Sequence, residues 1–157
     1  VLDPKLQEFE KALHRLNLNL AKQVVVDGEG AKKFITVNVQ GAKSTSMAKN
    51  IAFSIANSPL VKTAIAGEDP NWGRVIMAIG KSGEVININK IQIKFGKYLV
   101  TDQGRVSKEY NESDIKEYMK WDSILIDVNL NIGNANYTVY TCDLTHDYID
   151  INADYRN

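Results

Sequence analysis

One carboxylate in the sequence lies between two glycines, directly after a run of β-branched residues. Glu29 is flanked by Gly28 and Gly30 and follows Val24–Val26. Because glycine has no Cβ, the backbone on both sides of the acid can approach a ligand closely. A carboxylate in this setting suits a ligand that carries an ammonium group. The alternative is a plain turn with a solvated acid, since loops of this composition are ordinarily polar.

Four potential metal ligands lie close together near the C-terminus. They are Asp143, His146, Asp147 and Asp150, a mixture of hard and borderline donors that divalent cations accept. In a partly extended segment these side chains would alternate between opposite faces, and acidic residues beside a single histidine usually form caps or surface pairs. We therefore expect no metal site.

Two glycine-containing motifs resemble phosphate-binding loops, but each lacks a necessary residue. Gly80-Lys81-Ser82 matches the end of a P-loop, yet Val75 stands where the first glycine must leave room for phosphate. Gly28-Glu29-Gly30 follows a β-branched run, yet Lys33 replaces the third glycine of a dinucleotide-binding turn and the intervening acid would repel a pyrophosphate. Both motifs therefore predict turns and not nucleotide sites.

The composition is typical of a soluble domain that recognises small molecules or other proteins. Of 157 residues, 44% are hydrophobic, and 19 Lys and Arg balance 19 Asp and Glu. A neutral chain lacks the positive field of a general nucleic-acid or anionic-membrane binder, and no apolar run approaches the ~20 residues that cross a bilayer. The single Cys142 fits a reducing compartment. With no signal pattern after Val1, we expect a cytoplasmic protein.

The elements that must position these residues follow from apolar periodicity. Near the N-terminus, apolar residues recur at spacings of three and four, at Leu6, Phe9, Leu13, Leu16 and Leu20. This spacing predicts an amphipathic helix of about four to five turns, with Asp3 as its N-cap. Val24–Val26 and Phe34–Val39 are β-branched runs separated by a glycine-containing turn. We expect them to form a hairpin-like pair of strands.

Three further helices are predicted in close succession. They begin at Ser44 or Ser46, at Ser58 and at Asp69, and end at Asn57, Gly67 and Gly80. Alternation of apolar and polar residues predicts strands within 86–101, 124–132 and 137–142. The spacing of apolar residues predicts a short helix at 111–120. We therefore expect a single layered α+β domain over residues 1–157, with mostly antiparallel strands and a group of helices packed on the sheet.

Four regions carry a more specific pattern. They are Val25-Val26-Asp27-Gly28-Glu29-Gly30-Ala31, Ser58-Pro59-Leu60-Val61-Lys62-Thr63-Ala64, Asp69-Pro70-Asn71-Trp72-Gly73-Arg74, and the ending Thr141-Cys142-Asp143-Leu144-Thr145 to Ile151-Asn152-Ala153-Asp154-Tyr155-Arg156. In this order they resemble the ornithine acetyltransferase (glutamate N-acetyltransferase) family of arginine biosynthesis. The resemblance spans residues 25–156, which is nearly the whole chain.

The resemblance implies an enzyme that moves the acetyl group of N-acetylornithine to glutamate, giving ornithine and N-acetylglutamate. Family members resemble N-terminal-nucleophile enzymes, in which a precursor cleaves itself before a threonine. That threonine becomes the first residue of a β chain, and its hydroxyl accepts the acetyl group. Its own α-amine acts as the base for the hydroxyl. The present chain is similar to the later part of that β chain. We therefore expect the nucleophile upstream of Val1, no catalytic threonine within the chain, and no turnover by the chain alone.

Three residues match substrate-binding positions of the family. Glu29 matches the glutamate of the Asp-Gly-Glu-Gly motif, Asn152 matches an asparagine near the C-terminus, and Asn157 stands in place of a terminal Ser or Thr. The amide of Asn157 can still donate and accept hydrogen bonds. An ionised Glu29 would attract the side-chain ammonium of ornithine but repel the side-chain carboxylate of glutamate. Contact with the α-amino nitrogen common to both substrates avoids that conflict, and the sequence does not choose between the two amines.

The resemblance also implies partners and no resident cofactor. An α chain and the remainder of the β chain would complete an α2β2 assembly, the α chain would supply the oxyanion hole, and acetyl-CoA stands as an alternative acetyl donor. A hypothesis of another class is that the chain acts as a stable non-catalytic domain or interaction module separated from its enzyme.

Overall fold

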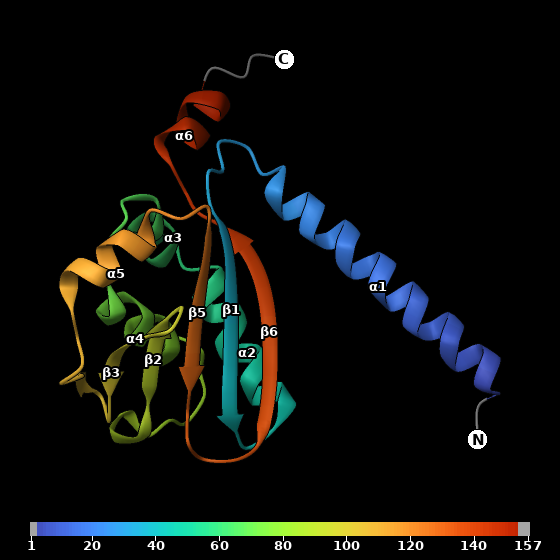
Figure 1. Cartoon of the computed structure of the whole chain (residues 1–157), viewed down its shortest axis with the longest axis horizontal. Helices are drawn as coiled ribbons and strands as arrows, with labels where there is room; N and C mark the ends of the chain where they lie inside the picture. The colour runs from blue at the N-terminus through green and yellow to red at the C-terminus, as the bar shows by residue number, and fades with distance from the viewer. Residues whose placement is uncertain (1–2, 154–157) are drawn as a thin grey trace.

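The computed structural model describes residues 3–153 and has one mixed sheet at its centre (Figure 1). Within these residues the strands are β1 Phe34–Ala42, β2 Gln92–Phe95, β3 Tyr98–Asp102, β4 Arg105–Val106, β5 Ser123–Asn129 and β6 Ala135–Cys142. Their order across the sheet is β4-β3-β2-β5-β1-β6. Strands β1 and β5 run parallel, and every other neighbouring pair runs antiparallel. The predicted α+β fold with mostly antiparallel strands is confirmed.

A group of helices covers one face of the sheet. Helix α2 (Thr45–Ala56) packs on β1 and β6, and α3 (Pro59–Ala66) and α4 (Trp72–Gly80) pack beside it; Figure 1 shows α2 behind these two strands. The hydroxyls of Ser44 and Ser58 accept backbone N–H groups of the first turns of α2 and α3, which explains why these helices begin where predicted. Helix α5 (Glu112–Met119) also lies where the sequence predicts a short helix.

The alternation of residues along β1 determines which face of the sheet is buried. Ile35 and the next two alternate residues of β1 are fully buried and pack on α2 residues such as Ile51. The residues between them point the other way and are half-buried. There the amides of Asn38 and Gln40 donate hydrogen bonds to the carboxylate of Asp127 on β5. One face is therefore the apolar core, and the other is a polar hydrogen-bonded layer.

The longest helix extends beyond the predicted end. Helix α1 runs from Pro4 to Val26, so Val24–Val26 end a helix and the predicted hairpin is wrong. No glycine or proline lies between Lys5 and Asp27, and β1 already has β5 on one edge and β6 on the other, which leaves no edge for a hairpin partner. None of the helices in residues 3–153 combines the length and the apolar composition needed to cross a membrane.

Several other boundaries differ from the prediction by a few residues, and two of these differences have a clear local cause. Helix α4 begins at Trp72 and not at Asp69, because the side chain of Asn71 is the acceptor that caps its first turn. The strands expected from residue 86 begin only at Gln92, because Ile88–Lys90 form a 3₁₀ turn. Neither difference changes the layers of the fold.

A tyrosine on α5 provides a test of how this helix is attached to the sheet. The Tyr118 hydroxyl accepts a hydrogen bond from the backbone N–H of Leu125 in β5 at 2.8 Å, and burial raises the pKa of Tyr118. We predict that Tyr118→Phe lowers the free energy of unfolding by about 1–2 kcal/mol, because a partly buried N–H loses its acceptor. Urea unfolding measures this change. Tyr98→Phe is the control, since its ring packs on Tyr118 but its hydroxyl has no hydrogen bond among the described residues; equal losses in both variants would contradict the assignment.

Candidate functional site

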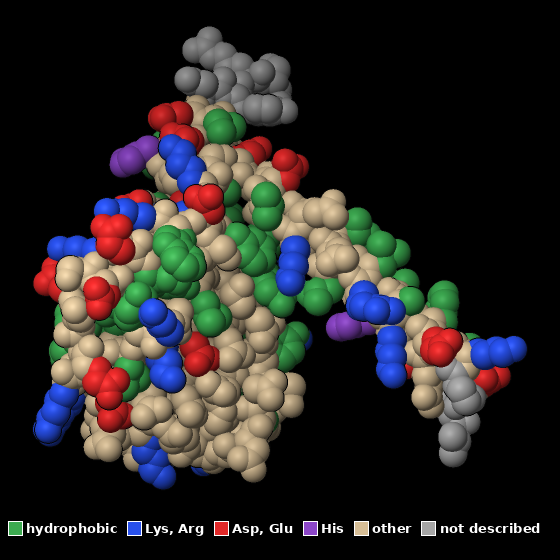
Figure 2. Space-filling model, viewed as in Figure 1, with side chains coloured by type: hydrophobic (Ala, Val, Ile, Leu, Met, Phe, Trp, Pro, Cys, Tyr) green, Lys and Arg blue, Asp and Glu red, His purple; other side chains and the backbone are tan. Residues whose placement is uncertain are grey.

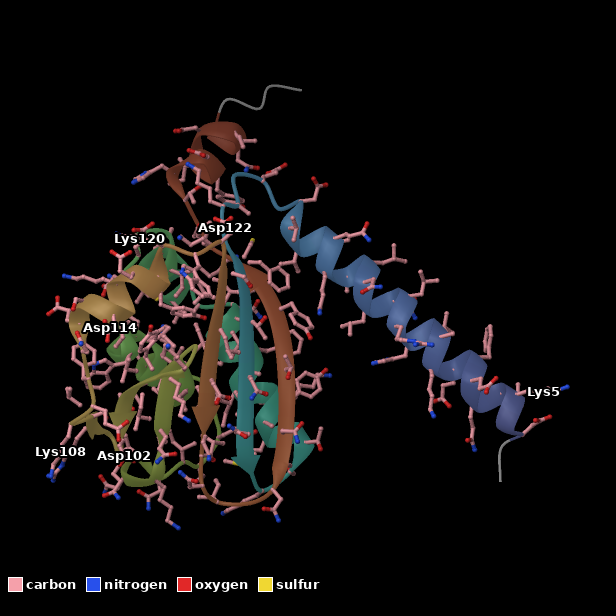
Figure 3. The ribbon with its side chains drawn as sticks, in the orientation of Figure 1. Lys5, Asp102, Lys108, Asp114, Lys120 and Asp122 are labelled. Atoms are coloured by element: carbon pink, nitrogen blue, oxygen red, sulfur yellow. The ribbon has the colours of Figure 1, made fainter. Side chains whose placement is uncertain are left out.

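The connection between α1 and β1 lies against the C-terminal end of the described chain. Residues 27–33 form this connection, which we call the entry loop, and they meet the segment that leads from β6 into α6 (His146–Ala153). Figure 1 shows α6 beside the entry loop, at the end of the sheet where β1 begins. Asp122, labelled in Figure 3, marks the same end, where its carbonyl accepts the N–H of Phe34 at 2.8 Å.

Asp143 joins the two segments through its carboxylate. Its Oδ1 accepts the backbone N–H groups of Lys32 at 2.8 Å and Lys33 at 2.9 Å, and its own N–H donates to the carbonyl of Lys33 at 3.1 Å. The residue is only 3% exposed, so these charge-assisted hydrogen bonds are shielded from water. Asp143 therefore holds the end of the entry loop to the end of β6.

Glycine is required at one position of the entry loop. Gly30 has φ +68°, and a Cβ there would lie 2.6 Å from the backbone nitrogen of Tyr148. Its carbonyl accepts a hydrogen bond from the hydroxyl of Thr145 at 2.7 Å. The sequence suggested that glycine here lets the backbone approach a ligand. At Gly30 the close approach is instead to the backbone of α6, which packs against the loop.

Two of the three predicted substrate-binding residues meet at this junction. The side-chain amide of Asn152 donates one hydrogen bond to Glu29 Oε2 and another to the carbonyl of Tyr148, both at 2.8 Å. Both side chains are exposed to solvent. Asn157, the third, lies outside the described residues.

The hydrogen bonds of Asn152 determine what the pair offers to a ligand. Both hydrogens of its amide are engaged, so the amide nitrogen has no donor left. Glu29 Oε1 and Asn152 Oδ1 accept no hydrogen bond from any residue between 3 and 153. The pair therefore presents oxygen acceptors, which suit a ligand with N–H groups and disfavour a carboxylate.

A pocket of about 450 Å³ lies between α3 and the start of α6, and Lys32, Thr63, Thr145 and Asp147 contribute to its lining. Lys32 and Asp147 form an ion pair across it at 2.9 Å. The hydrogen bond from Lys32 to Asp147, together with their opposite charges, raises the pKa of the lysine. The ion pair strengthens the contact between the entry loop and α6.

The acidic residues of the C-terminal segment have structural partners instead of one another. Asp143 binds backbone N–H groups and Asp147 binds Lys32, and no group of three His, Cys, Asp or Glu side chains in residues 3–153 is arranged to hold a metal ion. The segment is helical from His146, so the alternation of side chains considered for an extended segment does not apply from that residue onward.

Lys33 has a structural role that the sequence did not indicate. The residue is 8% exposed, and its ammonium donates to the carbonyls of Met119 at 2.9 Å and Trp121 at 3.2 Å, at and just after the end of α5. Burial of a lysine requires such partners. The ammonium of Lys33 also lies 3.5 Å from a carboxylate oxygen of Glu68. Sequence reasoning noted only that Lys33 breaks a dinucleotide motif, because all of these partners are distant in the sequence.

Comparison with known proteins identifies close relatives. Residues 2–157 match a family model described as the ArgJ family. The arginine biosynthesis bifunctional protein ArgJ of Ruegeria pomeroyi is 56% identical over 150 residues, which cover 96% of this chain and 37% of that protein. The protein of the same name from Brucella melitensis is 54% identical over 155 residues, covering 99% of this chain and 38% of that protein. The chain thus spans less than two fifths of the length of these curated relatives.

A solved structure is also similar. The crystal structure of the arginine biosynthesis bifunctional protein argJ from Bacillus halodurans matches with a TM-score of 0.93 at 44% sequence identity. The match covers 98% of this chain and 72% of that chain.

The role of Asp143 can be tested by its removal. We predict that Asp143→Ala lowers the free energy of unfolding by about 2–3 kcal/mol, because two backbone N–H groups lose a charged acceptor at a buried position. Asp150→Ala is a matched control, since Asp150 is exposed on α6 and surface substitutions usually change stability by less than about 0.5 kcal/mol. Chemical denaturation of both variants provides the measurement. If the two variants unfold at the same urea concentration, Asp143 does not hold the junction together.

Proposed function

The chain belongs to the ArgJ family, and we propose that it is part of an acetyltransferase that moves the acetyl group from N-acetylornithine to glutamate. In the first half of the reaction, the hydroxyl oxygen of a threonine outside this chain attacks the acetyl carbonyl. The bond from that carbonyl to the α-nitrogen of ornithine breaks, and the nitrogen takes the proton. In the second half, the α-amine of glutamate attacks the acetyl-threonine, which gives N-acetylglutamate and regenerates the hydroxyl.

The contribution of this chain is to bind the substrate. The observation that carries the proposal is the hydrogen bond between Glu29 and Asn152, which are 123 positions apart in the sequence. Each matches a substrate-binding position of the family, and together they present acceptors on an exposed surface. The two threonines that line the adjacent pocket have other hydrogen bonds: Thr145 donates to the carbonyl of Gly30, and Thr63 donates to the carbonyl of Leu60 within α3. This supports a nucleophile that comes from elsewhere in the enzyme.

The acceptor character of the pair favours one mode of substrate binding. Both substrates share an α-nitrogen, which carries the acetyl group in the donor and receives it in the acceptor. An N–H on this nitrogen can donate to Glu29 or Asn152 in both halves of the reaction, whereas the side-chain carboxylate of glutamate would be repelled by Glu29. We therefore propose that the α-nitrogen faces this pair.

The remaining parts of the proposal concern the assembly. We propose that the chain works with an α chain and the remainder of a β chain, as an α2β2 enzyme in the cytoplasm that arises by self-cleavage. The support is that relatives of 54–56% identity are more than twice as long as this chain. We propose no resident cofactor, with acetyl-CoA as an alternative acetyl donor.

We predict that Glu29→Gln in the complete enzyme lowers kcat/KM by roughly ten- to hundredfold, because a charge-assisted hydrogen bond to the substrate becomes a neutral one. Stability should barely change, since Gln keeps the acceptor that Asn152 uses. Steady-state kinetics of both half-reactions measure the effect, with Glu109→Gln, an exposed loop residue, as the control.

The two half-reactions separate the alternatives for Glu29. Equal losses in both mean contact with the shared α-nitrogen. Loss in the N-acetylornithine half alone means contact with the ornithine side chain. Native kinetics in both halves would mean that the Asp-Gly-Glu-Gly turn has only a structural role and that Glu29 does not bind the substrate.

We also predict that the 157-residue chain alone forms no N-acetylglutamate above the buffer rate from N-acetylornithine and glutamate. The physical reason is that neither the proposed nucleophile nor its α-amine is among these residues. Mass-spectrometric detection of N-acetylglutamate measures turnover, and the complete enzyme at equal concentration is the positive control. Turnover by the purified chain would place the nucleophile within it.

A further inference from the structure

Helix α1 carries an apolar stripe that no other part of residues 3–153 covers. The stripe consists of large side chains that are 43–73% exposed, at Leu6, Phe9, Leu13, Leu16, Leu20 and Val24. Figure 1 shows α1 projecting from the sheet, and Lys5, labelled in Figure 3, lies at the end farthest from the sheet. Exposed apolar patches of this extent mark interaction sites in soluble proteins.

The stripe faces away from the body of the protein. The half-buried residues of α1 near the sheet are Leu18, Lys22 and Val25, and the Lys22 ammonium lies 4.6 Å from the centre of the Tyr140 ring on β6. At about 100° per residue these positions lie on the opposite side of the helix from the stripe. In Figure 2, hydrophobic side chains follow the edge of α1 that is turned away from the sheet, and Lys and Arg side chains follow the other edge.

The spacing of the stripe is typical of helix-to-helix packing. Its first five members are separated by three, four, three and four residues, the 3.5-residue repeat of a seam that packs on another helix. Long helices gain most of their stability in proteins from a packed apolar face. A 23-residue helix with this face in water therefore requires a partner.

The direction of α1 is also preserved in another protein. The Bacillus halodurans structure matches 98% of this chain, which leaves about three residues unmatched, whereas α1 has 23. The match therefore includes most of α1, and the TM-score of 0.93 over the whole match supports a similar direction of this helix in the two proteins. A helix without lateral contacts would not keep one direction in two proteins that are 44% identical.

We propose that the apolar stripe of α1 is the docking surface for the polypeptide of the same enzyme that lies outside this chain, and that this polypeptide meets it with an apolar helix. The proposal rests on the proposed function for the identity of the partner. Relatives carry more than 60% of their length outside the matched region, so an occupant of sufficient size exists. The flanks of the stripe carry few charges, chiefly Lys5 and Glu10, which favours an apolar partner.

Docking on the stripe would also act on the candidate site. Helix α1 ends at Val26, three positions before Glu29. A partner that fixes α1 therefore fixes one end of the entry loop, while Asp143 fixes the other. Substrate binding would depend on assembly through this short connection.

Hydrogen exchange tests the proposal without a need for activity. In the complete enzyme, backbone amides of α1 between residues 10 and 24 should exchange at least tenfold more slowly than in the 157-residue chain alone, while amides of β1 and β5 exchange alike in both. Equal rates for α1 in the two forms would overturn the proposal. Protection in the isolated chain that grows with its concentration would assign the stripe to a second copy of the chain and would also overturn it.

A pair of variants tests the stripe itself. Leu13→Ala with Leu16→Ala keeps a strong helix former at both positions and should raise the exchange rate of α1 in the complete enzyme at least tenfold. Lys11→Ala with Arg15→Ala, on the opposite face, is the matched control and should leave it unchanged. Identical rates in the two pairs would overturn the proposal. A protected stripe combined with native kinetics of Glu29→Gln would remove Glu29 from the substrate site and leave the docking surface intact, and a protected stripe in a complete enzyme without acetyl transfer would reject the proposed function alone.

Discussion

The carboxylate of Asp143 is the interaction on which the geometry of the candidate site depends. The entry loop reaches β1 through Lys32 and Lys33, whose backbone N–H groups both need an acceptor because they precede the first residue of the strand. Asp143 follows the last residue of β6, and β6 is the antiparallel neighbour of β1, with Phe34 opposite Cys142. The sheet register therefore brings the carboxylate to the two N–H groups, and one buried oxygen accepts both.

The meeting of Glu29 and Asn152 is a consequence of that contact. Glu29 lies three residues before Lys32, and α6 begins three residues after Asp143, so both side chains are connected to the Asp143 contact by short segments. Gly30 has no Cβ, so the loop and the backbone of α6 can approach closely. The ion pair between Lys32 and Asp147 adds a second connection. Exposed ion pairs contribute little stability by themselves. The buried hydrogen bonds of Asp143 are therefore the larger contribution to the position of Asn152.

Local sequence signals predicted the parts of the fold that are determined locally. Ser44 and Ser58 begin α2 and α3 as expected, because a cap hydroxyl needs only its own first turn. Val24–Val26 were assigned to a strand on β-propensity. The assignment is wrong because β1, the strand they would pair with, already has β5 and β6 on its two edges. The resemblance to a family pointed to Glu29 and Asn152. Asp143 was expected to form a cap or a surface pair, and its buried contact with the N–H groups of Lys32 and Lys33 was missed. The structural role of Lys33 was also missed. The partners of both residues follow from strand register and helix packing and leave no local pattern.

The exposure of Glu29 and Asn152 limits what this chain can do without the rest of the enzyme. Two charges 4 Å apart attract by about 1 kcal/mol in water and by about 4 kcal/mol near a protein surface of lower effective dielectric constant. Glu29 is exposed to solvent within residues 3–153. Its attraction for an ammonium group or an amide N–H would therefore be close to the value in water. A polypeptide docked along α1 would end beside the entry loop, where it could exclude water from the pair as well as fix the helix that leads to it. Positioning and desolvation of Glu29 would then have the same physical cause. This explains why a helix whose apolar stripe is uncovered in residues 3–153 leads, within three residues of its end, to the side chain most suited to bind the substrate.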